Sequence, residues 1–135
     1  MIVGRFREVI PVVEARAVAA LWPRLSRVWL RIDPSAEHTL LAADDLGLLD
    51  GLVLPLDDME RLDVGFCQVT ALPQRVLLSF EGDDGRYYQE EVHAYIADGP
   101  PGSSRLGADV LSHWLTVLDP GSDSVLCEPL DFEPA

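Results

Sequence analysis

The stretch QRVLLSFEGDDGRYYQEEVHAYIA, residues 74–97, decides the fold that we expect from the sequence. Apolar and polar residues alternate along 74–80 and again along 86–97, which is the two-residue period of half-buried strands. The segment EGDDG at 81–85 separates the two runs and contains Asp-Gly, the strongest short hairpin signal in a sequence. We therefore expect two antiparallel strands joined by a tight turn.

The two faces of this hairpin differ in chemistry. The expected core face carries Val76, Leu78, Phe80, Tyr88, Glu90, Val92, Ala94 and Ile96. The opposite face carries Tyr87, Gln89, Glu91, His93 and Tyr95, to which Trp29, Arg27 and Arg31 add if their strand lies nearby. Aromatic side chains are enriched in contact patches, so this second face is a candidate binding surface. The alternative is an ordinary solvated face of an antiparallel sheet.

Further elements follow from the same periodicities on either side of the hairpin. Strands are expected at 2–7, 26–33, 38–43, 66–72 and 125–127, with 26–33 and 38–43 forming a second hairpin. Pro11 and Pro23 are expected to bound a helix over 12–22, since proline suits a first helical turn and stops a helix that precedes it. Ser103 or Ser104 would cap a second helix, whose apolar face runs from Leu106 to Leu118. The acidic, leucine-rich connector 44–63 is expected to be irregular, with a short helix at 57–62.

This order of elements predicts an α+β fold. The length argues for a single globular domain over 1–135, with a frayed tail at 129–135. We expect a mostly antiparallel sheet of about five strands, with an N-terminal and a C-terminal helix packed on one face. A parallel α/β sheet would need a helix after nearly every strand, and the sequence does not provide them.

Charge is the most unusual property of the composition. Asp and Glu number 23 against 10 basic residues, all of them Arg, for a net charge of −13. Residues 1–37 hold six of the arginines and carry a net charge of +2, whereas residues 38–135 carry −15. Such a field disfavours nucleic acid and anionic membranes and favours a basic partner. Coding bias or adaptation to salt would produce a similar excess of acid.

The residues that could carry chemistry do not form a recognisable constellation. Cys67 and Cys127 lack metal-type spacing and are expected to be free thiols. The pair Glu91 and His93 shares a strand face, but no nucleophile or second acid accompanies it. His113 follows Asp109 by four positions, which predicts a helical surface pair. We expect no cofactor and no metal site, and no apolar run reaches the roughly 20 residues of a membrane helix.

Size and charge together indicate a binding protein rather than an enzyme. The profile of a small, acidic domain is similar to that of bacterial immunity proteins, which implies a cytoplasmic inhibitor that occludes a basic, nucleic-acid-acting toxin. The expected partner-binding residues are Asp57, Asp58, Glu60, Asp63, Tyr87, Glu91, His93, Tyr95 and Trp29. Two alternatives stay open: an enzyme or small-ligand domain with a pocket between sheet and helices, and an accessory subunit that docks through the connector. The sequence leaves the oligomeric state open.

Overall fold

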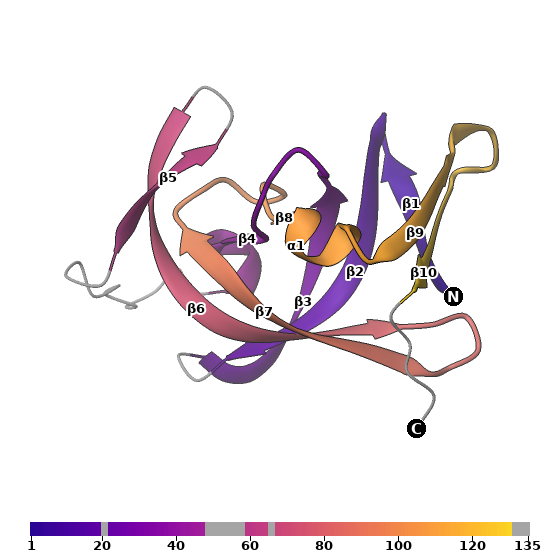
Figure 1. Cartoon of the computed structure of the whole chain (residues 1–135), viewed down its shortest axis with the longest axis horizontal. Coiled ribbons are helices and arrows are strands. Elements are labelled where there is room, and N and C mark those ends of the chain that lie inside the picture. Colours follow the sequence, from indigo (N-terminus) through magenta and orange to yellow (C-terminus); the bar gives the residue numbers. More distant parts are fainter. Residues whose placement is uncertain (20–21, 48–58, 65–66, 131–135) are drawn as a thin grey trace.

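The computed structural model describes residues 1–19, 22–47, 59–64 and 67–130, and strands dominate this part of the chain (Figure 1). The strands are β1 (Ile2–Arg7), β2 (Ile10–Ala19), β3 (Trp22–Ile32), β4 (Leu40–Ala42), β5 (Glu60–Val64), β6 (Cys67–Glu81), β7 (Tyr87–Ala97), β8 (Arg105–Leu106), β9 (Trp114–Asp119) and β10 (Ser124–Pro129). The helical elements are η1 (Ala43–Leu46), α1 (Ala108–Leu111) and η3 (Pro120–Ser122), each of one turn.

Six of the strands close into a barrel. The sheet order runs β5-β6-β7-β4-β8-β3-β2-β1-β10-β9, and an additional pairing joins β2 to β6. That pairing sets Arg16 opposite Ser79 and Val18 opposite Leu77, so β6, β7, β4, β8, β3 and β2 form a ring. Closure of this kind removes sheet edges that would otherwise present unpaired backbone groups.

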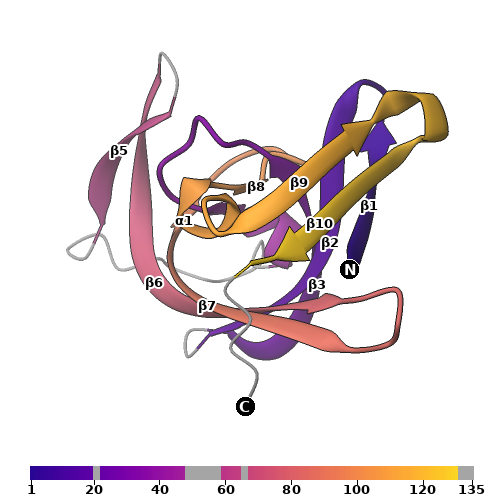
Figure 2. The same cartoon turned by 45° about the vertical axis from the view of Figure 1, so that its right-hand side comes forward.

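Two extensions leave the barrel. β5 pairs with the first residues of β6, Cys67–Ala71. At the other end of the sheet, β1 pairs with β10, and β10 pairs with β9 to form the C-terminal hairpin. Figure 2 shows β9, β10 and β1 side by side, with the long β6–β7 hairpin running beneath them. In the described residues, no helix is long and apolar enough to span a membrane.

The core fills the inside of the barrel. Its largest fully buried side chains include Leu30, Leu41, Val76, Leu78, Phe80, Ile96 and Leu106. Phe80 meets Trp114 edge to face, with 4.8 Å between the ring centroids. This contact packs the start of β9 against the barrel, so the C-terminal hairpin and the barrel share one core.

The central hairpin is confirmed. β6 and β7 pair from Ala71 opposite Ala97 to Glu81 opposite Tyr87. Burial alternates as expected, since Val92, Ala94 and Ile96 are buried while His93 is exposed. The strands expected at 66–72 and 74–80 are one element, because Pro73 continues the strand instead of ending it.

The predicted α+β class and the helix at 12–22 are wrong. Residues 12–19 belong to strand β2, and Val13, Ala15 and Ala17 are buried while Glu14 and Arg16 are partly exposed. The burial of alternate residues over 13–17 is the two-residue period of a strand and not the period of a helix. Pro11 and Pro23 lie within strands rather than at helix ends.

The expected C-terminal helix is also wrong. α1 spans only Ala108–Leu111, Leu106 belongs to β8, and Trp114–Asp119 forms strand β9, which pairs with β10. Leu115 and Leu118 are 56% and 48% exposed instead of lining a core-facing stripe. In the described residues neither long helix is present, so no such helix packs on the sheet, which has ten strands instead of the expected five.

The middle of the chain differs in two further ways. β4 does not pair with β3 in a hairpin but lies parallel to β7 and antiparallel to β8. Residues 60–62 of the helix expected at 57–62 belong to strand β5, and 57–58 lie outside the described residues. Pro129 ends β10 instead of fraying, while 131–135 of the predicted tail are outside the described part.

Candidate functional site

Asp33 lies at the point where β3 leaves the barrel, and both of its carboxylate oxygens are engaged. Oδ1 accepts hydrogen bonds from the backbone N–H of Ser35 at 3.2 Å and from its hydroxyl at 2.5 Å. Oδ2 accepts one from the guanidinium of Arg105, with 3.0 Å between Nη1 and oxygen. The side chains of Asp33 and Arg105 are only 23% and 24% exposed, so the ion pair is largely withdrawn from water.

The pKa of Asp33 is held below its ordinary value. Burial by itself raises this pKa, but the Ser35 hydroxyl, the Arg105 charge and the N–H groups of Ser35 and Ala36 together outweigh it. The carboxylate is therefore the stable form. A group in this state accepts hydrogen bonds and pairs with a cation, and it holds a proton poorly at neutral pH.

Two more aspartates, Asp45 and Asp109, accept hydrogen bonds from residues near β4 and β8. Asp45 accepts hydrogen bonds from the Ser104 hydroxyl at 2.6 Å and from the Gly102 N–H at 2.8 Å. Asp109 accepts them from the hydroxyl and the N–H of Thr39, at 2.8 and 2.9 Å. Thr39 and Ser104 are fully buried, so these contacts satisfy polar groups inside the protein. The three carboxylates tie the segment after β3 to the segment around β8.

Glu90 is the fourth carboxylate engaged inside the protein. Its oxygens lie 3.2 Å from Nε2 of His113, and one accepts a hydrogen bond from Nε1 of Trp114 at 3.1 Å. The surface pair that we predicted between Asp109 and His113 is wrong, because Asp109 turns toward Thr39 and His113 toward β7. These four partly buried carboxylates act as structural acceptors.

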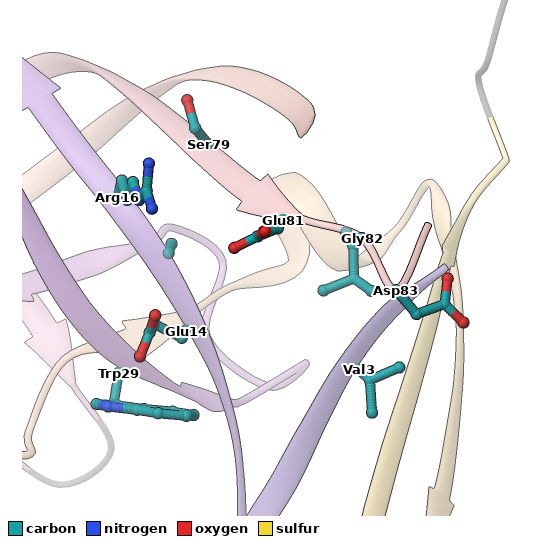
Figure 3. A pocket seen from close by; sticks show the side chains of 10 residues that line it. Val3, Glu14, Arg16, Trp29, Ser79, Glu81, Gly82 and Asp83 are labelled. Carbon is teal, nitrogen blue, oxygen red and sulfur yellow. The ribbon is translucent and has the colours of Figure 1, made fainter. Parts of the chain in front are cut away.

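Cavities lie on the outside of the barrel around Trp29. One of them measures about 290 Å³ and is lined by Glu14, Arg16, Trp29 and Glu81 among others. Figure 3 shows Glu14 and Trp29 lying together, with Ser79 and Glu81 coming from β6. Two neighbouring cavities, of about 180 and 250 Å³, also have Trp29 and Arg7 in their walls.

Cations surround the Trp29 ring. The guanidinium carbons of Arg5 and Arg7 lie 4.7 and 4.8 Å from the ring centroid, within cation–π range. Arg16 lies 5.3 Å from the centroid of Tyr87 in the same manner. Trp29 and Tyr87, both predicted as partner-binding residues, therefore lie on the outer wall of the barrel beside arginines that extend from β1 and β2.

The remaining predicted partner-binding residues lie further along this wall. Glu91 forms an exposed ion pair with Arg75, with 3.0 Å between Nε and oxygen, and His93 is opposite Arg75 in the β6–β7 register. This arrangement places no described side chain where it would orient His93 as a catalytic base, so it does not support Glu91 and His93 as a catalytic pair. Tyr95 donates a hydrogen bond to Glu60 at 3.4 Å. Burial followed by the Glu60 charge raises the pKa of the Tyr95 phenol.

The acidic residues of the connector are only partly placed. Glu60 is in β5 and exposed, next to Tyr95. The backbone of Asp63 is in β5, whereas Asp57 and Asp58 lie outside the described residues. The predicted acidic rim is therefore represented by Glu60.

The sequence interpretation missed Asp33 and Arg105 as a pair, and it missed Arg5 and Arg7. Asp33 was placed at the end of the strand expected at 26–33, and no local spacing connects it with a residue 72 positions away. Arg5 and Arg7 did carry a signal, since residues two apart on a strand share a face. Because residues 2–7 show only a weak alternation of apolar and polar residues, this shared face was not recognised as a candidate site.

Comparison with solved structures finds a protein of similar fold. No protein-family model and no curated protein matches the sequence. Among solved structures, the chain is similar to a retropepsin-like aspartic protease from Rickettsia conorii, with a TM-score of 0.53 and 15% identity. The match covers 95% of this chain and 90% of that one. The chain therefore has a retropepsin-like fold, and at this identity the likeness extends to the fold alone.

Proposed function

We propose that this chain is a non-catalytic, protein-binding domain on a retropepsin-like barrel. The observation that carries the proposal is the state of Asp33, whose two oxygens are occupied by Ser35 and Arg105. An aspartic protease works with two carboxylates that share one proton, so one of the pair must hold that proton at working pH. A lowered pKa and a cationic partner oppose this requirement.

The second candidate is a peptidase assembled from two copies, each of which contributes Asp33. The likeness to a retropepsin-like aspartic protease favours it. Such an enzyme would require both Asp33 side chains to leave Arg105 and to approach one another.

A peptidase assay separates the two candidates. Wild-type protein and the Asp33→Asn variant are incubated with denatured casein between pH 3 and pH 7, with product peptides measured by mass spectrometry. We expect no cleavage by either protein. Cleavage by the wild type that is absent in Asp33→Asn would contradict the proposal and establish the peptidase.

As a binding protein, the chain fits the inhibitory role expected from its charge. A net charge of −13 supports fast encounter with a basic toxin domain, and Tyr95 with Glu60 supplies an aromatic anchor next to an acid. Both residues lie at the β5 end of the barrel wall. The partner would be a basic protein whose cleft this end fills.

Titration calorimetry against the product of the adjacent reading frame tests this role. We expect binding that weakens with salt, and a loss of about tenfold in affinity for Glu60→Gln, the size expected of a charge pair inside an interface. Glu37→Gln removes an equal charge from an exposed loop and is the matched control. Salt-independent binding, or equal losses in both variants, would contradict the role.

A further inference from the structure

The outer wall at β1–β3 is cationic in a protein that is otherwise strongly acidic. Arg5, Arg7, Arg16, Arg27 and Arg31 come from these three strands and gather around Trp29; we call them the arginine–tryptophan surface. Within the described residues, none of the five has a carboxylate within the 4.0 Å of an ion pair. Half of the arginines of the chain are thus collected on one wall without an acidic partner.

Strand register explains the gathering. Arg31 is opposite Val12, and Val12 is opposite Arg5, so the three residues project from the same face. Arg16 and Arg27 are opposite one another four positions along the same two strands. Like charges directly opposite each other are destabilising, so this arrangement costs stability unless an anion shares the surface.

Trp29 is the centre of the surface. It lines each of the three cavities described above, and Arg7 and Gly102 line the two smaller ones. Arg31 donates a hydrogen bond from Nε to the Gly102 carbonyl at 2.9 Å, which fixes its guanidinium at the rim. Tryptophan and arginine are enriched among the residues that carry most of the energy of protein interfaces, and guanidiniums beside an aromatic face suit a partner that carries both carboxylates and apolar groups.

We propose that the arginine–tryptophan surface binds an acidic peptide segment of a partner protein. Three shallow cavities of about 180–290 Å³ fit an extended chain better than a compact small molecule, whose pockets usually exceed about 300 Å³. Glu14, Glu81 and Asp83 line the cavity of about 290 Å³, and Glu8 and Asp45 each line one of the two smaller ones, so carboxylates along the surface repel the dense charge of a nucleic-acid strand. A peptide places its carboxylates at wider intervals and can set them beside the arginines and away from these acids, of which Asp45 already accepts hydrogen bonds from Gly102 and Ser104.

This inference is independent of the proposed function, because it concerns a cationic wall and an acidic partner rather than the β5 end and a basic one. It holds or fails whether or not the chain cleaves peptides. The chemistry required is several carboxylates and at least one aromatic or aliphatic side chain to lie on Trp29.

Fluorescence anisotropy with three labelled probes tests the proposal. The probes are the peptide Glu-Glu-Phe-Glu-Glu, its counterpart Gln-Gln-Phe-Gln-Gln, and an eight-nucleotide oligothymidylate. We expect wild-type protein to bind the acidic peptide about tenfold more tightly than the neutral one, from several exposed pairs of modest strength. Equal affinity for both peptides, or tighter binding of the oligothymidylate, would overturn the proposal.

A charge-matched pair of double variants locates the site. Arg7→Gln with Arg27→Gln should weaken binding of the acidic peptide about tenfold. Arg75→Gln with Arg86→Gln removes the same charge from residues already paired with Glu91 and Asp84, and should bind like the wild type. If both double variants lost affinity for the acidic peptide equally, the binding would depend on net charge alone, and the assignment of the site to the arginine–tryptophan surface would be overturned. Circular dichroism of each variant confirms that it is folded.

Discussion

Arg105 and Asp33, 72 positions apart in the sequence, are joined by an ion pair with 3.0 Å between Nη1 and Oδ2. The pair links the first residue of β8 to the residue that follows β3, and these two strands are neighbours in the barrel. Nε of Arg105 is buried and has no hydrogen-bond partner among the described residues. The guanidinium therefore depends on Asp33 for the compensation of its charge.

Removal of the Asp33 charge should destabilise the protein in a pH-dependent way. Because the pKa of Asp33 is lower in the folded state, its contribution is complete above the unfolded value of about 3.9 and is lost as pH falls through the folded value. Asp33→Asn should cost about 1–3 kcal/mol in the free energy of unfolding at pH 7. Urea unfolding at pH 7 and pH 3 measures this cost. An equal cost at both pH values would contradict the assignment.

Gly107 should not tolerate a side chain. A Cβ there would lie 2.6 Å from the carbonyl carbon of His38 and 2.8 Å from the carbonyl oxygen of Ala36. Both neighbours are backbone, so Gly107→Ala should lower the free energy of unfolding by about 1–3 kcal/mol. Gly121→Ala is the control, since its nearest atom would be 3.5 Å away. Thermal unfolding that leaves both variants equal would show that the loops can separate at little cost.

Glu90 and Glu91 are adjacent but should differ in their effect on stability. Glu90→Ala leaves Nε1 of the buried Trp114 without its acceptor, which should cost about 1–3 kcal/mol. Glu91→Ala breaks an exposed pair with Arg75 and should cost less than about 1 kcal/mol. Urea unfolding followed by tryptophan fluorescence measures both. A larger loss for Glu91→Ala would contradict the structural role of Glu90.

Cys127 should be slow to react in the folded protein. Burial raises the pKa of its thiol to about 11, although a hydrogen bond involving Thr116 lowers it, so little thiolate exists at pH 8. In a Cys67→Ser background, Ellman's reagent should modify Cys127 at a rate that follows unfolding and rises with urea. Immediate modification in native buffer would show that β10 opens on its own.

The sequence predicted the local elements better than their assembly. The β6–β7 hairpin could be read directly, because alternation and an Asp-Gly turn act over a few residues. The segment 12–22 could not, since Ala and Val at short spacing satisfy both a helical stripe and a strand face. Packing in the barrel decides between strand and helix for this segment, because small residues such as Ala15 and Ala17 are buried on its inner face.

The candidate sites depended on contacts far apart in the chain. Trp29 and Tyr87 were found because aromatic residues on a polar strand face are visible locally. The Asp33–Arg105 pair requires β8 to lie beside β3, and neither the spacing of residues nor the composition of the sequence indicates this parallel pairing. The charge of +2 in residues 1–37 pointed to a cationic region, but only the register of β1, β2 and β3 gathers it on one wall.

The position of β4 has a consequence for synthesis. This strand lies between β7 and β8, and the residues that pair with it follow it in the sequence by 55 or more positions, so its partners do not exist when it leaves the ribosome. Closure of the barrel must wait until Arg105 and Leu106 have emerged, and distant pairings of this kind slow folding. Until then, the apolar residues of β4 are exposed on a nascent chain, at the stage where chaperone binding would be most useful.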